Sequence, residues 1–152
     1  MKQAMAEGDE EKARGRNMRQ LLLRVSRIVN RQVVEGLQAR GYAGLRSTHT
    51  TLLSNMPLAG GAVTLVAERA GISKQAMGRL AVELERAGYL RVMTDPSDAR
   101  VRRLELTETG RKLMRDSFDV MADLERRYAE LIGPDVLQAT LDGLTAFGEA
   151  MD

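Results

Sequence analysis

Residues 63–80 decide the fold, and they read VTLVAERAGISKQAMGRL. Small Ala67 and the apolar residues around it, at spacings of three and four, predict two short helices that cross at close range. Gly71 stands between them, where a left-handed backbone conformation costs glycine little. Ser73 follows as a suitable N-cap for the second helix. The stretch therefore predicts a helix-turn-helix, with a plain helical hairpin as the alternative.

The second helix, expected over about 74–87, carries polar and basic side chains at its start. Such a helix fits the major groove of DNA with its first residues at base edges and phosphates. Gly78 stands among these residues, although glycine weakens a helix by about 1 kcal/mol relative to alanine. The absence of a side chain at Gly78 would allow close approach either to DNA or to another helix. The residues expected to contact DNA from this helix are Ser73, Lys74, Gln75, Met77 and Arg79.

Two short strands are expected next, over 89–94 and 101–106, joined by the turn-forming segment DPSDAR at 95–100. In the second strand Leu104 and Leu106 alternate with charged residues, which predicts one buried and one solvated face. A helix-turn-helix followed by such a hairpin is typical of a winged helix. Arginine suits phosphate oxygens and the narrow minor groove. The wing arginines expected to contact DNA are Arg91, Arg100, Arg102 and Arg103.

Amphipathic helices flank this core. Apolar residues recur at helical spacing over 18–40 and 111–132, and Pro134 begins a last helix. These helices carry more apolar surface than a winged helix of roughly 70 residues can cover, which favours a homodimer. We expect a mainly α fold with a small β-wing, divided into a loose N-terminal arm (1–15), an N-terminal dimerisation helix (16–45), a winged helix-turn-helix domain (46–107) and C-terminal dimerisation helices (108–152).

Composition excludes several classes of protein. The 152 residues contain no Cys and one His, so disulfides, cysteine-ligated metals and thiol chemistry are ruled out. The chain has no Gly-rich phosphate loop, no Ser–His–acid arrangement and no metal-ligand spacing. We therefore expect no enzyme activity, no catalytic residues, no metal and no cofactor.

Charge is distributed unevenly. Through residue 115 there are 21 Lys and Arg against 12 Asp and Glu, and after it 2 against 9. A basic first three-quarters suits a polyanion such as double-stranded DNA. No stretch approaches the roughly 18–20 apolar residues of a membrane span, and the first twenty residues lack a secretory signal. We expect no membrane association and a cytoplasmic location.

Four motifs together resemble the MarR (multiple antibiotic resistance regulator) family of bacterial transcription factors. They are LVAERAGISKQAM at 65–77, LERAGYLR at 84–91, DPSDAR at 95–100 and LTETG at 106–110. The resemblance covers about residues 46–113. It implies a winged-helix core between terminal helices that intertwine as a homodimer. The resemblance further implies that the two recognition helices read adjacent major grooves of a near-palindromic operator and that Arg100, at the wing tip, enters the minor groove.

The function implied by this resemblance is DNA-binding transcriptional regulation, usually repression. The alternative is a winged-helix protein-docking module without sequence-specific DNA binding. Asp98 resembles the family's wing acid, which orients nearby arginines; a simple turn-forming role is the alternative. Family members are often released from DNA by small aromatic or anionic effectors bound between the dimer helices and the DNA-binding lobe. The effector residues so implied are Tyr42, Arg46, His49 and Met56, although a histidine on a short amphipathic helix, like His49, is more often structural than a ligand contact.

Overall fold

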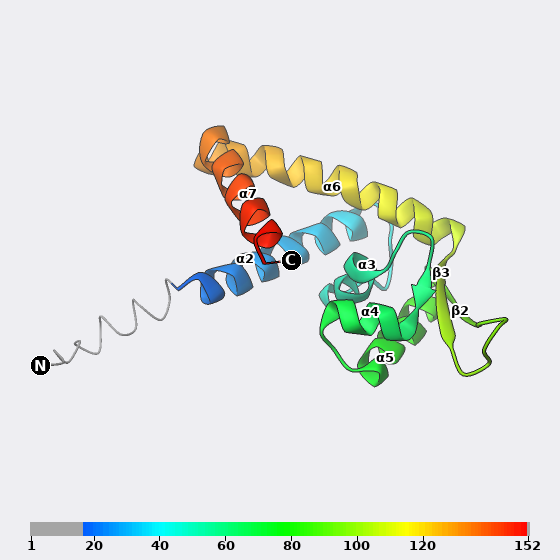
Figure 1. Ribbon diagram of the computed structural model, residues 1–152. Helices are drawn as coiled ribbons and strands as arrows, with labels where there is room; N and C mark the ends of the chain where they lie inside the picture. The colour runs from blue at the N-terminus through cyan, green and yellow to red at the C-terminus, as the bar shows by residue number, and fades with distance from the viewer. Residues whose placement is uncertain (1–16, 152) are drawn as a thin grey trace, which may run out of the picture.

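The computed structural model describes residues 17–151, in a winged-helix lobe and a helical arm (Figure 1). The mainly helical fold with a small β-wing is confirmed, and the expected arm over 1–15 lies outside the described residues. The helical arm consists of α2 (Met18–Ala39), α6 (Glu108–Ile132) and α7 (Pro134–Glu149). The lobe consists of the 3₁₀ turn η1 (Ser47–His49), α3 (Thr50–Asn55), β1 (Gly61–Ala62), α4 (Val63–Ala70), α5 (Lys74–Arg86), β2 (Leu90–Thr94) and β3 (Arg102–Leu106).

Local side-chain chemistry sets the boundaries of the central helices. Gly71 ends α4 in the left-handed region, with φ of 65°. The Ser73 hydroxyl accepts the Ala76 backbone N–H at 3.1 Å and so caps α5. The Thr107 hydroxyl caps α6 in the same way, accepting the Gly110 N–H at 3.0 Å. The helix-turn-helix expected from the sequence is therefore confirmed.

The wing belongs to a three-stranded antiparallel sheet with the order β1-β3-β2. The register of the hairpin pairs Leu90 with Leu106 and Leu104 with Val92. The sequence did not indicate β1, because two residues are too few to show an alternating pattern. Gly61 of this strand pairs with Leu104, so the sheet joins the segment before α4 to the wing.

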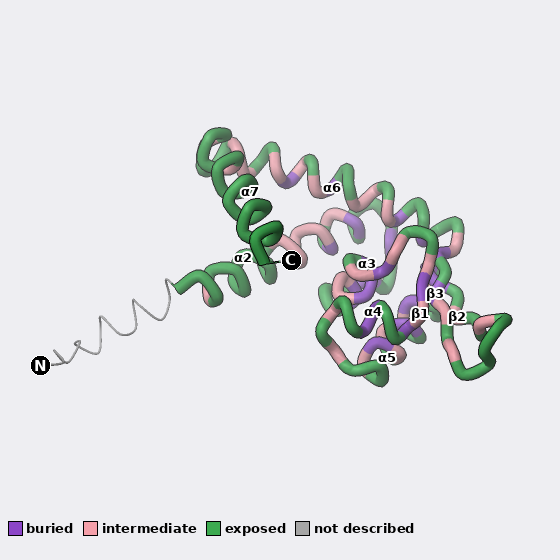
Figure 2. Tube along the Cα trace, in the orientation of Figure 1, coloured by how far each residue is buried: buried purple, intermediate pink, exposed green. Residues whose placement is uncertain are grey.

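The core fills the space between α3, the helix-turn-helix and the inner face of the sheet, and it continues between α2 and α6 (Figure 2). Side chains from four different elements, Leu52, Val66, Leu84 and Leu104, are each 0% exposed. Burying each of them stabilises the fold by about 1.5–3 kcal/mol. The lobe is therefore a firm base for the exposed faces of α5 and the wing.

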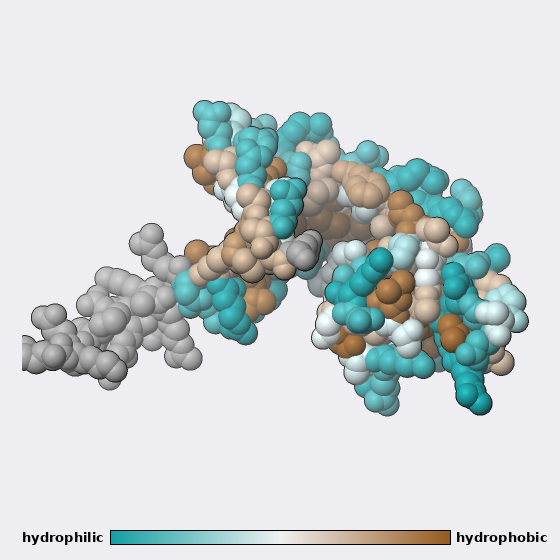
Figure 3. Space-filling model, in the orientation of Figure 1, coloured by the Kyte–Doolittle hydropathy of each residue, from teal (hydrophilic) through white to brown (hydrophobic). Residues whose placement is uncertain are grey.

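Helices α2 and α6 pack side by side, and α7 folds back beside α6 (Figure 1). Every residue of α7 is exposed or half-buried. Apolar surface gathers over α7 (Figure 3). The largest exposed apolar side chains of these three helices are Met18, Leu21, Leu22, Leu23, Val25, Ile28, Phe118, Leu131, Ile132, Val136, Leu141, Leu144 and Phe147.

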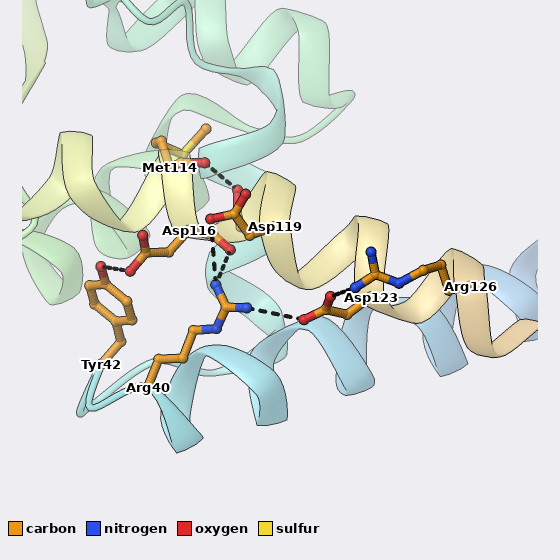
Figure 4. A network of polar contacts seen from close by, with 8 residues as sticks. Arg40, Tyr42, Met114, Asp116, Asp119, Asp123 and Arg126 are labelled. Carbon is orange, nitrogen blue, oxygen red and sulfur yellow. Dashed lines mark hydrogen bonds and ion pairs between the residues drawn. The ribbon is translucent and has the colours of Figure 1, made fainter.

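Polar contacts join the end of α2 to α6 (Figure 4). The Tyr42 hydroxyl donates to Asp116 Oδ2 at 2.6 Å. The Arg40 guanidinium donates to the Asp116 carbonyl at 3.2 Å and to the Asp123 carboxylate at 3.2 Å. Burial, followed by the hydrogen bond to Asp116, raises the pKa of Tyr42 to about 12. This network fixes the end of α2, and the segment that leads from it to η1, against α6.

Alkaline pH is expected to weaken this junction. A raised pKa in the folded state adds stability that is present below the ordinary tyrosine pKa near 10 and is lost as pH rises through about 12. Tyr42→Phe should therefore be less stable than wild type at pH 8, by about 1 kcal/mol, and the two unfolding curves should converge near pH 12. Chemical denaturation across that range measures this. The other tyrosines are common to both proteins, so they do not contribute to the difference. A difference in stability that stayed constant from pH 8 to pH 12 would contradict the raised pKa assigned to Tyr42.

Gly110→Ala should strongly destabilise the start of α6. An added Cβ would lie 2.0 Å from the Tyr89 carbonyl oxygen and 3.2 Å from the Leu106 side chain. Because the nearest atom is backbone, α6 would have to move away from the sheet, at a cost of about 1–3 kcal/mol. Thermal unfolding measures the loss. Gly143→Ala is the control, since its Cβ meets nothing within 4 Å; equal Tm changes would contradict this packing.

Candidate nucleic-acid interface

The exposed face of α5 begins at the turn of the helix-turn-helix. Ser73, Lys74, Gln75 and Arg79 are all exposed, as a surface contact requires. The Ser73 hydroxyl caps α5. The residue itself remains exposed, as do the side chains of Lys74 and Gln75 that follow it. Four of the five residues expected to contact DNA from this helix therefore lie together at its N-terminal end.

Met77 corrects the sequence-based expectation. Its side chain is 0% exposed and belongs to the core of the lobe. A fully buried side chain cannot contact DNA, so the prediction that Met77 contacts DNA is wrong. The spacing explains why, since Met77 lies four residues before the buried Ala81 and on the same face of α5.

Gly78 lies in a shallow hollow of about 360 Å³ on the outer face of α5. Within the described part of the chain, no atom lies within 4 Å of the position a Cβ would take, so no helix of this chain approaches it closely. Of the two explanations considered for this glycine, close approach to DNA or to another helix, residues 17–151 supply no helix close to it. The residues lining the hollow are Gln75, Gly78, Arg79, Val82, Glu83 and Arg86.

The wing carries its arginines in two different states. Arg91, Arg100 and Arg102 are exposed, whereas Arg103 is half-buried and forms an ion pair with Asp95 at 3.3 Å. Hydrogen bonds from Ser97, aided by Arg103, lower the pKa of Asp95 below its ordinary value. Arg103 is therefore held against the hairpin, while the other three arginines are open to a ligand.

Asp98 acts on the backbone of the turn. Its Oδ1 accepts the Arg100 backbone N–H at 2.9 Å, which shapes the wing tip. In the described structure the acid that pairs with a wing arginine is Asp95. The sequence did not single out Asp95 for this role, because both carboxylates lie in one turn-forming segment.

The four residues expected at an effector site do not line one cavity. Tyr42 is bonded to Asp116, and Arg46 and His49 both contact Glu83 of α5. Met56 lines a different space, a cavity of about 460 Å³ between α2, α3 and α6. None of the described residues that line this cavity is charged; they are Val29, Asn30, Val33, Leu37, Thr50, Leu53, Ser54, Met56, Leu58, Leu113, Met114, Ser117, Phe118 and Met121.

Other kinds of site find no support in the described residues. Over residues 17–151 no group of three or more His, Cys, Asp or Glu side chains is placed to hold a metal ion. The described helices include none that is long and apolar enough to cross a membrane.

A helix-turn-helix with a basic exposed helix face, followed by an arginine-bearing hairpin, defines a winged-helix protein. Solved structures share this architecture over nearly the whole chain. One is a MarR-family transcriptional regulator from Rhodococcus sp. RHA1, with 26% identity, a TM-score of 0.67, and coverage of 95% of this chain and 96% of that one. No protein-family model and no curated protein matches the sequence.

Two further structures agree. CouR from Rhodococcus jostii RHA1, bound to p-coumaroyl-CoA, is 28% identical with a TM-score of 0.63, over 88% of this chain and 92% of that one. AbsC, a MarR-family regulator from Streptomyces coelicolor, shares the fold at 22% identity and a TM-score of 0.64, over 98% and 97%. The chain therefore has the winged-helix fold of MarR-family regulators, and the resemblance carried by its sequence motifs is confirmed.

Proposed function

We propose that this chain is a DNA-binding transcriptional regulator, a repressor, that acts as a homodimer in the bacterial cytoplasm. The observation that carries the proposal is the placement of the exposed face of α5 and of the wing on the side of the lobe away from α7 (Figure 1). A helix and a hairpin placed in this way suit the major groove and the neighbouring minor groove. Solved structures that share its fold are transcriptional regulators, and we expect no enzyme activity.

The proposed interface joins the recognition helix to the wing. Lys74, Gln75 and Arg79 contact bases and phosphates in the major groove, and Arg100 enters the minor groove. Arg91 and Arg102 contact phosphates at the base and along the edge of the wing. Ser73 approaches the DNA through its backbone, while Asp98 and Arg103 shape the wing rather than bind.

The proposed dimer uses the helical arm. Residues 16–45 and 108–152 form the dimer body, and residues 46–107 form the DNA-binding domain. The apolar side chains exposed on α2, α6 and α7 would be covered by the same surface of a second chain. A two-fold dimer brings two copies of α5 to major grooves about one DNA turn, ~34 Å, apart, which a near-palindromic operator requires.

An effector is part of the proposal. CouR is a structure bound to p-coumaroyl-CoA, and the cavity between α2, α3 and α6 is of a volume suited to a small molecule. Of the residues expected at such a site, the proposal keeps Met56, because it lines this cavity.

Salt is expected to weaken binding to DNA steeply. If each chain neutralises phosphates with Lys74, Arg79 and Arg100, a dimer makes six such contacts, and its affinity falls about 10³-fold between about 50 and 200 mM salt. Titration of genomic fragments that include the region upstream of the gene measures this. Binding without a salt slope, or no binding to any fragment, would instead favour a protein-docking module.

A further inference from the structure

The imidazole of His49 is buried, at 1% exposure. Its Nδ1 lies 3.2 Å from the Arg46 backbone nitrogen, which can only donate a hydrogen bond. Nδ1 is therefore the acceptor, and Nε2 carries the proton. That proton points to Glu83 Oε2 at 2.9 Å. Both ring nitrogens are satisfied within the chain, which leaves no ring atom free for a ligand.

Glu83 belongs to the recognition helix. It lines the hollow on the outer face of α5 together with Gly78 and Arg79. Its Oε2 atom accepts from the Arg46 guanidinium as well as from His49. These two hydrogen bonds lower the pKa of Glu83. One carboxylate oxygen thus joins the third turn of α5 to the segment that begins α3.

The negative charge of Glu83 matters because this residue lies on the helix proposed to contact DNA. A free carboxylate on a helix face that lies against DNA would repel phosphate groups. Arg46 offsets that charge from an exposed position, since its side chain is 61% exposed. His49 supplies a fixed, buried donor, so the direction of the carboxylate is set from inside the lobe.

We propose that Arg46 and His49 are positioning residues for DNA recognition, which hold the recognition helix in place and offset the charge on its outer face through Glu83. The proposal rests on the proposed function. It assigns a binding role to residues that do not themselves touch DNA.

The first test compares His49→Gln with His49→Leu. A glutamine can donate to Glu83 and accept from Arg46, whereas leucine has a similar size and can do neither. We expect His49→Gln to bind a duplex selected by the wild type with nearly wild-type affinity, and His49→Leu to bind about tenfold more weakly. Equal affinities for the two folded variants would overturn the proposal.

The second test uses side chains on the surface, so it does not depend on a change in the core. Arg46→Ala removes the positive charge beside Glu83, leaves its carboxylate only the hydrogen bond from His49, and should weaken DNA binding. Adding Glu83→Gln to Arg46→Ala removes the carboxylate charge and should restore part of the affinity. A purely structural role for Arg46 predicts no such restoration, so a double variant as weak as Arg46→Ala or weaker would overturn the charge argument.

Hydrogen exchange of the α5 amides separates this proposal from the proposed function, because it needs no DNA. Exchange in α5 should be faster in His49→Leu than in His49→Gln, with α7 as the internal control. Unchanged exchange in α5 would overturn the positioning role even if the wild type binds DNA. Faster exchange together with no DNA binding by the wild type would contradict the proposed function alone.

Discussion

A chain that ends at Gly133, and so lacks α7, is expected to be a monomer and to bind operator DNA about 10²-fold or more weakly than the full chain. The physical reason is that α7 carries an apolar face which its own chain leaves open. Leu141, Leu144 and Phe147 are 38%, 43% and 47% exposed. Without this face the two copies of α5 are no longer held in one dimer. Each chain must then bind its half-site independently, so the gain in affinity from linked binding is lost.

Light scattering measures the mass, and a DNA titration measures the affinity. A chain that ends at Glu149 keeps all of α7 and is the matched control, since it should remain a dimer with wild-type affinity. Circular dichroism checks that the shortened chain still folds, as the core of the lobe does not include α7. A dimer of unchanged stoichiometry after removal of α7 would contradict the role assigned to this helix.

Replacing Lys74, Arg79 and Arg100 together by Ala is expected to reduce operator binding about a thousandfold or more, because each contact contributes about 1–3 kcal/mol and distant contacts add. All three side chains are exposed, and none forms an ion pair with a described residue that the replacement would break. Thermal stability should therefore stay close to that of the wild type. The salt slope should fall too, since fewer phosphates are neutralised.

The control removes the same number of charges elsewhere. Arg24, Lys112 and Arg127 lie on α2 and α6, outside the proposed DNA interface; they are exposed and form no ion pair with a described residue. Their triple replacement by Ala lowers the net charge equally. If the two triple variants lost equal affinity, the attraction would come from overall charge rather than from α5 and the wing.

The lobe could be predicted from the sequence because short-range chemistry determines it. Gly71 supplies a left-handed residue, Ser73 and Thr107 supply helix caps, and each acts within three or four residues of its partner. The strands of the wing showed a clear alternation. Strand β1 did not, because its pairing with β3 depends on residues about forty positions away.

The candidate site was harder to predict where a side chain has a distant partner. Met77 was expected to contact DNA from α5, but its side chain packs in the core of the lobe. His49 is bonded to Glu83, 34 residues away, and Tyr42 to Asp116, 74 residues away. No local spacing reveals such pairs. For this reason Tyr42, Arg46 and His49 were predicted to contact an effector, whereas in the structure they connect elements of the fold.

Selection of bound duplexes from a pool of random DNA tests the proposed function most directly, because it assumes no operator. The full-length protein is mixed with the pool at near-physiological salt, and the retained duplexes are sequenced after several rounds. Our account predicts enrichment of an inverted repeat whose half-site centres lie about 10 base pairs apart, bound by two chains. A retained pool with no enriched sequence would contradict it.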